Sequence, residues 1–183
     1  MKFIFDFDDV LFNTSKHRGH PLFKEYQFSV IEKAGISMEA ILEYYEKERL
    51  NQISLKKMLQ HFSLDMGLYD VVLDQSKNFI NTEMLDLVQK LGKSNCIIVT
   101  YGDTEFQLDK IKRSGIESMF SGVIAVSGSK KESIENFCEE NKYEKIFFID
   151  DSDKHFKELD LIKYPNLKTV HYTGQHLDLG SFT

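Results

Sequence analysis

The sequence predicts an α/β protein: a doubly wound parallel sheet that carries a small all-helical insertion. Two observations lead to this prediction. Short apolar segments alternate with segments that have helical periodicity, which is typical of right-handed crossovers in a parallel sheet. One long stretch, residues 15–81, interrupts the alternation, because it has helical patterns but no convincing strand.

Five segments have the composition of buried strands. Each is short and largely apolar, without the alternation expected of a strand with one face in water. Strands covered by helices on both faces have such continuous apolar runs. The predicted strands cover residues 2–7, 95–100, 122–126, 145–149 and 167–172.

The helices between the later strands are predicted from their periodicity and end signals. Thr82 is a candidate N-cap for a helix that ends at Gly92. The apolar face of this helix follows the i, i+3, i+4, i+7 rule and consists of Met84, Leu87, Val88 and Leu91.

Two further helices follow along the chain. One is predicted over about residues 104–114, with Leu108 and Ile111 facing inward. Ser129 and Glu132 have the spacing of a capping box and predict the start of another helix.

The interruption after the first strand predicts two structural units. Residues 1–14 and 82–183 would form the α/β core domain, and residues 15–81 a helical cap domain. Apolar stripes at helical spacing lie within this insertion, and core packing explains them. They include Met38, Ile41, Leu42, Tyr45, Leu55, Met58, Leu59 and Phe62.

Composition excludes several classes of protein. The 183 residues carry a net charge of −6 and no block of basic residues, so a nucleic acid polymer is not an expected partner. No stretch reaches the ~18–20 continuous apolar residues of a membrane span. The N-terminal segment does not resemble a signal peptide, and two cysteines, Cys96 and Cys138, read as small buried residues. We therefore expect a cytoplasmic protein without a membrane partner, whose oligomeric state the sequence leaves undetermined.

Acidic, hydroxyl and lysine side chains follow the predicted strands. In an open α/β sheet the site lies at the carboxyl ends of the strands. Any one of these acids could simply cap a helix or stabilise a turn, but all four strand ends carry residues suited to one site. Clustered carboxylates need a cation, and an all-oxygen cluster favours Mg²⁺. With a hydroxyl and a lysine they would form a phosphoryl-transfer site. The residues are Asp6, Asp8, Asp9, Thr100, Asp103, Lys130, Lys131, Asp150 and Asp151.

Four motifs in this arrangement resemble those of the haloacid dehalogenase (HAD) superfamily of phosphohydrolases, which have a Rossmann-like core. They are FIFDFDDVLFNT, IIVTYGD with the helix after it, the lysine in SGSKKES, and IFFIDDSDKHF. The first is the most specific, and the second is weak on its own. The helical insertion is similar to a cap of the type that the family places between its first and second motifs.

The resemblance implies catalytic roles for four residues. Asp6 would be the nucleophile that forms an aspartyl-phosphate. Asp8 would be the general acid that protonates the leaving oxygen and then the base that activates water. Thr100 would hydrogen-bond the transferring phosphoryl group, and Lys130 would neutralise charge on Asp6 and on the phosphoryl oxygens.

The resemblance also implies a Mg²⁺ site and a hydrolytic reaction. Asp6, the main-chain carbonyl of Asp8, and the pair Asp150 and Asp151 would surround the ion. An alkoxide leaving group needs a proton and a halide does not, so Asp8 favours a phosphatase, a hydrolase of phosphate monoesters, over a dehalogenase. The expected substrate is a small phosphorylated metabolite.

Some positions depart from the family pattern or stay undecided. Lys130 and Lys131 are adjacent, and we favour Lys130 as the motif lysine. Tyr101 stands where many relatives carry Asn, and Asp9 where others have Gly.

The start of the insertion has an open role. Its basic side chains could reach a second anionic group on the substrate, or could belong to a solvated linker. These residues are Lys16, His17, Arg18 and His20.

Three other functions are weighed against the phosphatase. A phosphomutase or other phosphotransferase uses the same core residues, so the sequence does not separate it. A non-catalytic HAD-like binding module has no chemical need for the complete set of residues. A receiver domain is disfavoured, because its acid pair follows the first strand and its phosphorylated Asp follows a later one.

Overall fold

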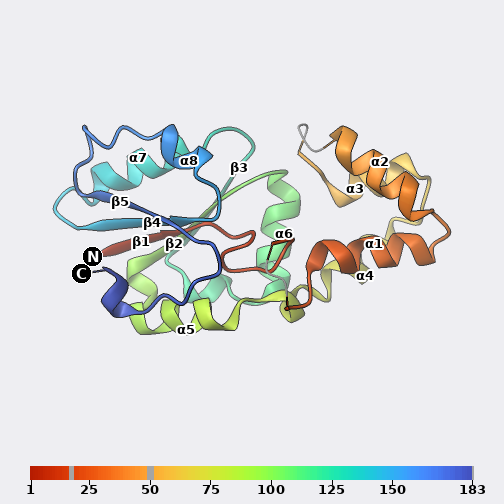
Figure 1. Cartoon of the computed structure of the whole chain (residues 1–183), viewed down its shortest axis with the longest axis horizontal. Helices are drawn as coiled ribbons and strands as arrows, with labels where there is room; N and C mark the ends of the chain where they lie inside the picture. Colours follow the sequence, from red (N-terminus) through yellow and green to blue (C-terminus); the bar gives the residue numbers. More distant parts are fainter. Residues whose placement is uncertain (17–18, 49–51, 183) are drawn as a thin grey trace.

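The computed structural model describes residues 1–16, 19–48 and 52–182 and has one five-stranded sheet (Figure 1). All strand pairs are parallel, in the order β3-β2-β1-β4-β5. The strands are β1 (Lys2–Phe5), β2 (Cys96–Tyr101), β3 (Gly122–Val126), β4 (Ile146–Asp150) and β5 (Leu167–His171). The predicted doubly wound α/β class and its five strands are thus confirmed.

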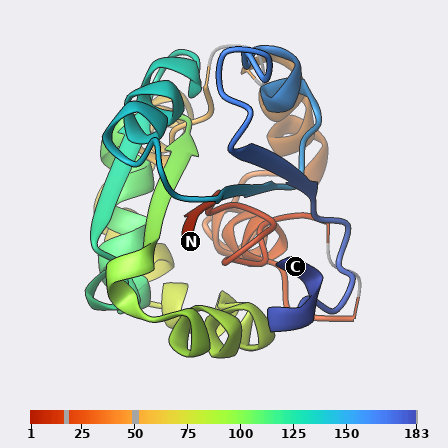
Figure 2. The same ribbon diagram turned by 90° about the vertical axis from the view of Figure 1, so that its left-hand side faces the viewer.

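Helices cover both faces of the sheet (Figures 1 and 2). One face packs against α5 (Thr82–Leu91) and α6 (Thr104–Ser114), and the other against α7 (Lys131–Glu140) and α8 (Lys154–Lys157). Short 3₁₀ helices complete the core: η2 (Lys93–Asn95), η3 (Glu117–Met119) and η4 (Leu179–Phe182). Aromatic rings fill much of the first face, with Phe3, Phe147 and Phe182 in mutual contact.

Three local predictions were wrong. The N-cap of α5 is Asn81, whose side chain accepts from the main-chain N–H of Met84, and Thr82 is the first helical residue. Leu108 is exposed, because the inner face of α6 runs through other positions. Ser129 forms no capping box: its hydroxyl accepts from the N–H of Lys131, two residues on.

In the described residues between β1 and α5, every named element is a helix, and these helices lie to one side of the core (Figure 1). It consists of α1 (Phe23–Lys33), α2 (Met38–Glu48), α3 (Leu55–His61), α4 (Gly67–Leu73) and the 3₁₀ helix η1 (Ser76–Phe79). Its buried side chains are continuous with those under α6, so the insertion rests against the carboxyl-end edge of the sheet. Leu42 of the predicted apolar stripe is exposed.

The helices in residues 1–16, 19–48 and 52–182 are short or partly polar, and none has both the length and the apolar character needed to cross a membrane.

Candidate active site

The carboxylates of Asp6, Asp150 and Asp151 meet at one edge of the sheet. One oxygen from each lies within 4.8 Å of the others. The topology explains this meeting, because β1 and β4 are parallel neighbours with Phe5 opposite Ile149. The residues that follow therefore emerge side by side at the carboxyl ends of the two strands.

A buried lysine neutralises part of this charge. The Nζ atom of Lys130 lies 2.7 Å from Oδ1 of Asp6 and 2.7 Å from Oδ2 of Asp150, and its side chain is 1% exposed. The adjacent Lys131 is 48% exposed and pairs with Glu135 at 3.8 Å. The structure therefore places Lys130, and not Lys131, against the acids.

The carboxylates are only partly compensated. Burial raises the pKa of Asp6 to about 7; Lys130 opposes this shift and Asp150 adds to it. Burial also raises the pKa of Asp151, although Lys16 forms an ion pair with it. Asp6 and Asp151 therefore hold a proton more readily than a carboxyl in water, chiefly because burial disfavours their charged form.

The donor set fits a hard divalent cation. Three carboxylate oxygens converge, and within the described part of the chain no nitrogen or sulfur ligand of the kind a softer metal would favour joins them. Mg²⁺ would add positive charge beside Asp6 and so favour its ionised form, which burial disfavours. Asp6, Asp150 and Asp151 would hold it, while the predicted contribution of the Asp8 carbonyl stays a prediction.

The hydroxyl of Thr100 is poised for a ligand. Thr100 is fully buried near the end of β2, two residues beyond Ile98, which pairs with Phe5 of β1. Its Oγ1 has no hydrogen-bond partner in the described part of the chain. Buried hydroxyls are normally satisfied, so an unpaired one at this edge fits a phosphoryl oxygen.

The side chain of Asp8 lies apart from the three-acid cluster, in a set of contacts of its own. Lys110 Nζ lies 2.6 Å from Oδ1 and 2.9 Å from Oδ2, and Gln107 Nε2 donates to Oδ2 at 2.7 Å. The hydroxyl of Thr14 also donates to Oδ1. Burial would raise the pKa of Asp8, but Lys110, Thr14 and Gln107 outweigh it and lower the pKa below its ordinary value.

Lys110 and Gln107 were missed by the sequence analysis. The signal was the polar character of the inner face of α6, where both residues are buried among apolar ones. The prediction had placed Leu108 on the inner face of α6, and this put Gln107 and Lys110 outside the predicted inner face.

Two departures from the family pattern have structural explanations. Asp9 has a φ of +57°, a left-handed conformation that Asp tolerates better than most residues. Its carboxylate accepts hydrogen bonds from Ser15 and from the N–H of Lys16, and so stabilises the loop after β1. Tyr101 packs toward α8, with its ring centroid 5.8 Å from that of His155.

The basic start of the insertion is described in part. Lys16 pairs with Asp151 of the acid cluster, and both Lys16 and His20 line a cavity of about 320 Å³ near Tyr172. His17 and Arg18 lie outside the described residues, so their predicted contact with substrate stays a prediction.

A small chamber of about 110 Å³ lies between the insertion and the core, beside Asp8. Its core wall includes Asp8, Gln107 and Lys110, and its cap wall includes Lys24 and Tyr45. It is therefore a space in which a group attached to a bound phosphoryl could lie next to Asp8.

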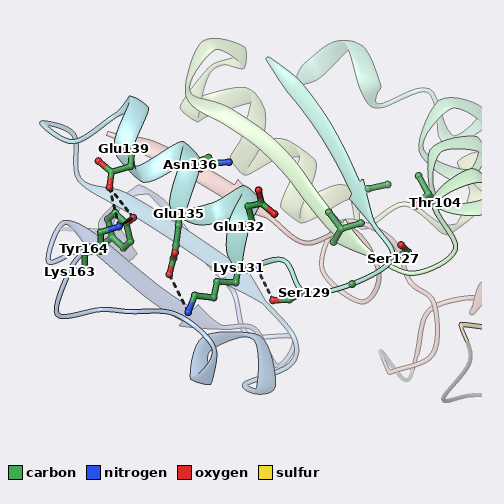
Figure 3. A pocket seen from close by; sticks show the side chains of 13 residues that line it. Thr104, Ser127, Ser129, Lys131, Glu132, Glu135, Asn136, Glu139, Lys163 and Tyr164 are labelled. Atoms are coloured by element: carbon green, nitrogen blue, oxygen red, sulfur yellow. Dashed lines mark hydrogen bonds and ion pairs between the residues drawn. The ribbon is translucent and has the colours of Figure 1, made fainter.

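A larger cavity, of about 770 Å³, is elsewhere (Figure 3). It lies between the edge of β3 and α7, where Lys131 contacts Glu135, and Lys163 contacts Glu139. None of the four predicted catalytic residues lines it. Volume alone does not identify the site here.

Solved structures with the same architecture are hydrolases and related enzymes of the HAD superfamily. A haloacid dehalogenase-like hydrolase from Burkholderia xenovorans LB400 matches with a TM-score of 0.70 and 21% identity, over 95% of this chain and 82% of its own. The magnesium-bound HAD-hydrolase YfnB from Bacillus subtilis matches with a TM-score of 0.58 and 14% identity, over 97% and 92%. A structure named as a beta-phosphoglucomutase from Thermotoga maritima matches with a TM-score of 0.56 and 19% identity, over 96% and 88%.

This chain thus has the fold of the HAD-superfamily hydrolases. No protein-family model matches its sequence, and no curated protein matches it either. At such low identities the likeness establishes the fold, and the reaction must be argued from the residues of the site.

Proposed function

We propose that this protein is a Mg²⁺-dependent phosphatase that hydrolyses a small phosphorylated metabolite through an aspartyl-phosphate on Asp6. The observation that carries the proposal is the position of Lys130, whose ammonium lies 2.7 Å from both Asp6 and Asp150. A nucleophilic carboxylate, a buried cation, an unpaired threonine hydroxyl and an acid pair are the parts that phosphoryl transfer requires.

The reaction has two halves. In the first, an Asp6 oxygen attacks phosphorus, the bond to the leaving oxygen breaks, and Asp8 gives that oxygen a proton. In the second, Asp8 takes a proton from water, the water oxygen attacks phosphorus, and the Asp6 carboxylate leaves. Lys130 and Thr100 hold the phosphoryl oxygens throughout. Mg²⁺, when bound, supplies positive charge beside the phosphoryl group.

The contacts of Asp8 favour its proposed role as a base in the second half of the reaction, when water attacks phosphorus. Its lowered pKa keeps it ionised near neutral pH, ready to accept a proton from water. To act first as an acid it must take up a proton as the substrate binds. An acid at this position still favours ester hydrolysis over dehalogenation, because a halide leaves without a proton.

The chamber beside Asp8 supports a compact substrate. Its volume of about 110 Å³ suits a leaving group of few atoms, and Lys24 offers one cation on the cap wall, with Nζ 3.6 Å from the centre of the Tyr45 ring. The proposed compartment is the cytoplasm, in keeping with two buried free thiols at Cys96 and Cys138.

The test is phosphate release from an aryl phosphate and a panel of metabolites, with Mg²⁺ and with EDTA. We expect Mg²⁺-dependent release by the wild type and by Lys131→Met, and none by Asp6→Asn. Release that persists in Asp6→Asn would refute the mechanism. Transfer of phosphate within a sugar, without release, would identify a phosphomutase instead.

A further inference from the structure

The carboxylate of Asp8 is held by donors from two segments that are far apart in the sequence. Lys110 Nζ contacts both oxygens, at 2.6 and 2.9 Å, and Gln107 Nε2 donates to Oδ2 at 2.7 Å. Thr14, from the loop after β1, donates to Oδ1. We call Lys110 and Gln107 the α6 clamp. Asp8 and both clamp residues line the chamber beneath the cap.

The ammonium group of Lys110 is rigidly enclosed. Its side chain is 3% exposed, although a lysine normally extends into water. Its Nζ lies between 5.1 and 5.9 Å from the centres of four aromatic rings, three from the core and one from the cap helix α1. These rings belong to Phe7, Phe12, Phe23 and Phe106. An ammonium fixed in this way can impose one position on the carboxylate that pairs with it.

The backbone also makes room for Gln107. Gly102 has a φ of +147°, and a Cβ atom there would lie 2.7 Å from Nε2 of Gln107. The same Nε2 donates to the main-chain oxygen of Tyr101 at 3.2 Å, which fixes the orientation of the amide. The close approach of Gly102 therefore allows the amide to reach Asp8.

We propose that Lys110 and Gln107 are positioning residues that hold the Asp8 carboxylate at the chamber wall, directed at the leaving oxygen and away from Asp6. This inference rests on the proposed function. The clamp would matter most when the leaving group needs a proton. It would matter little when the departing anion is stable by itself.

The value of kcat/KM across a series of phosphate esters tests this idea, because it reports the steps up to departure of the leaving group. The series runs from 4-nitrophenyl phosphate through phenyl phosphate to an alkyl phosphate, all with saturating Mg²⁺. The variants are Lys110→Met, Lys110→Arg, Gln107→Leu and Asp8→Asn. Lys112→Met is the matched control, since Lys112 lies on the same helix and is exposed.

We expect Lys110→Met to lower kcat/KM for the alkyl ester by ~10²-fold, as for loss of general acid catalysis, and for the nitrophenyl ester less than about threefold. Asp8→Asn should show the same selectivity, and adding Lys110→Met to it should cause little further loss, because the two act as a unit. Lys110→Arg should recover part of the alkyl activity. Lys112→Met should match the wild type.

An equal loss across the whole ester series would overturn the clamp and leave the phosphatase intact. Additive losses in the double variant would do the same, because they would assign Lys110 a purely structural role. If Lys110→Met does not fold, Gln107→Leu must show the same selectivity, or the inference fails. A wild type that releases no phosphate would overturn both this inference and the proposed function.

Discussion

Replacing Lys130 with methionine would remove the buried cation from a cluster of three carboxylates. Two contacts of 2.7 Å, to Asp6 and Asp150, would be lost at once. Breaking a buried ion pair by removing one partner costs about 3–5 kcal/mol, because the remaining charge stays buried and unpaired. The free energy of unfolding should therefore fall by about 3 kcal/mol at pH 8 in EDTA.

The loss should depend on pH in a defined direction. The pKa of Asp6 in the folded protein is about 7, above its ordinary value of 3.8, and removing Lys130 would raise it further. A raised folded pKa means that the stability contribution is fully present below pH ~4 and is lost as pH rises through the folded pKa. The variant should therefore come close to the wild type near pH 5, where Asp6 can bind a proton, and fall behind it at pH 8.

Urea unfolding in EDTA at pH 5 and pH 8 would measure both effects, with Lys131→Met as the control. Lys131 is 48% exposed and its pair with Glu135 is 3.8 Å long, so its loss should change stability by less than about 0.5 kcal/mol. In thermal scans ~3 kcal/mol corresponds to a Tm lower by roughly 6–12 °C for a chain of this size. Phosphatase kcat should fall by ~10²–10³-fold. Equal unfolding midpoints for the two variants at pH 8 would refute the assignment of Lys130 as the charge-compensating residue.

Three further changes follow from the structure. Asp151→Asn replaces one of the three converging carboxylates, so the affinity for Mg²⁺ should fall about tenfold or more, which is a loss of ~1.4 kcal/mol in binding free energy. Calorimetry would measure this affinity, and an unchanged Kd would argue against the site. Burial lowers the pKa of His155 to about 4, so the free energy of unfolding should fall as pH drops from 6.5 to 4. This fall should be on the order of 3 kcal/mol. His155→Phe should abolish it, so that the free energy of unfolding of the variant changes less with pH than that of the wild type. Gly102→Ala should cost ~1–3 kcal/mol in unfolding experiments through strain at φ +147°, and should slow alkyl esters more than nitrophenyl ones because it displaces Gln107; an equal effect on both would contradict this.

The fold was predictable because helices cover the sheet on both faces. Each strand is then a nearly continuous apolar run, and five such runs identify five parallel strands. The errors fell where the signal is local and weak. Asn81 and Thr82 are both good N-caps, and only the backbone conformation decides between them. Leu108 is apolar yet exposed, since a single apolar residue does not define the inner face of α6.

The site was predictable only in part. Topology alone brings Asp6 and Asp150 together, because both lie at the carboxyl ends of parallel neighbouring strands. The choice between Lys130 and Lys131 required the structure, since one position along a helix turns a side chain by ~100°. The contact of Lys110 with Asp8 joins residues 102 positions apart and carries no local signature beyond a polar residue on an inner helix face.

The charges at this edge of the sheet form two separate groups with different purposes. Asp8 and Lys110 form an ion pair of opposite charges, so together they add no net charge beside the acid cluster. In the other group, the described residues are three acids against Lys130 and Lys16, which leaves one negative charge in excess among them when all are ionised. Burial is the main cause of the raised pKa of Asp6, and the charge of Asp150 adds to it. A divalent cation would reverse the sign of the group and so favour both an ionised nucleophile and an anionic phosphoryl group, which the acids alone would repel. Under the proposed mechanism, the Asp8–Lys110 pair would position a proton and the other group would bind the anionic phosphoryl group, so that one small site could do both.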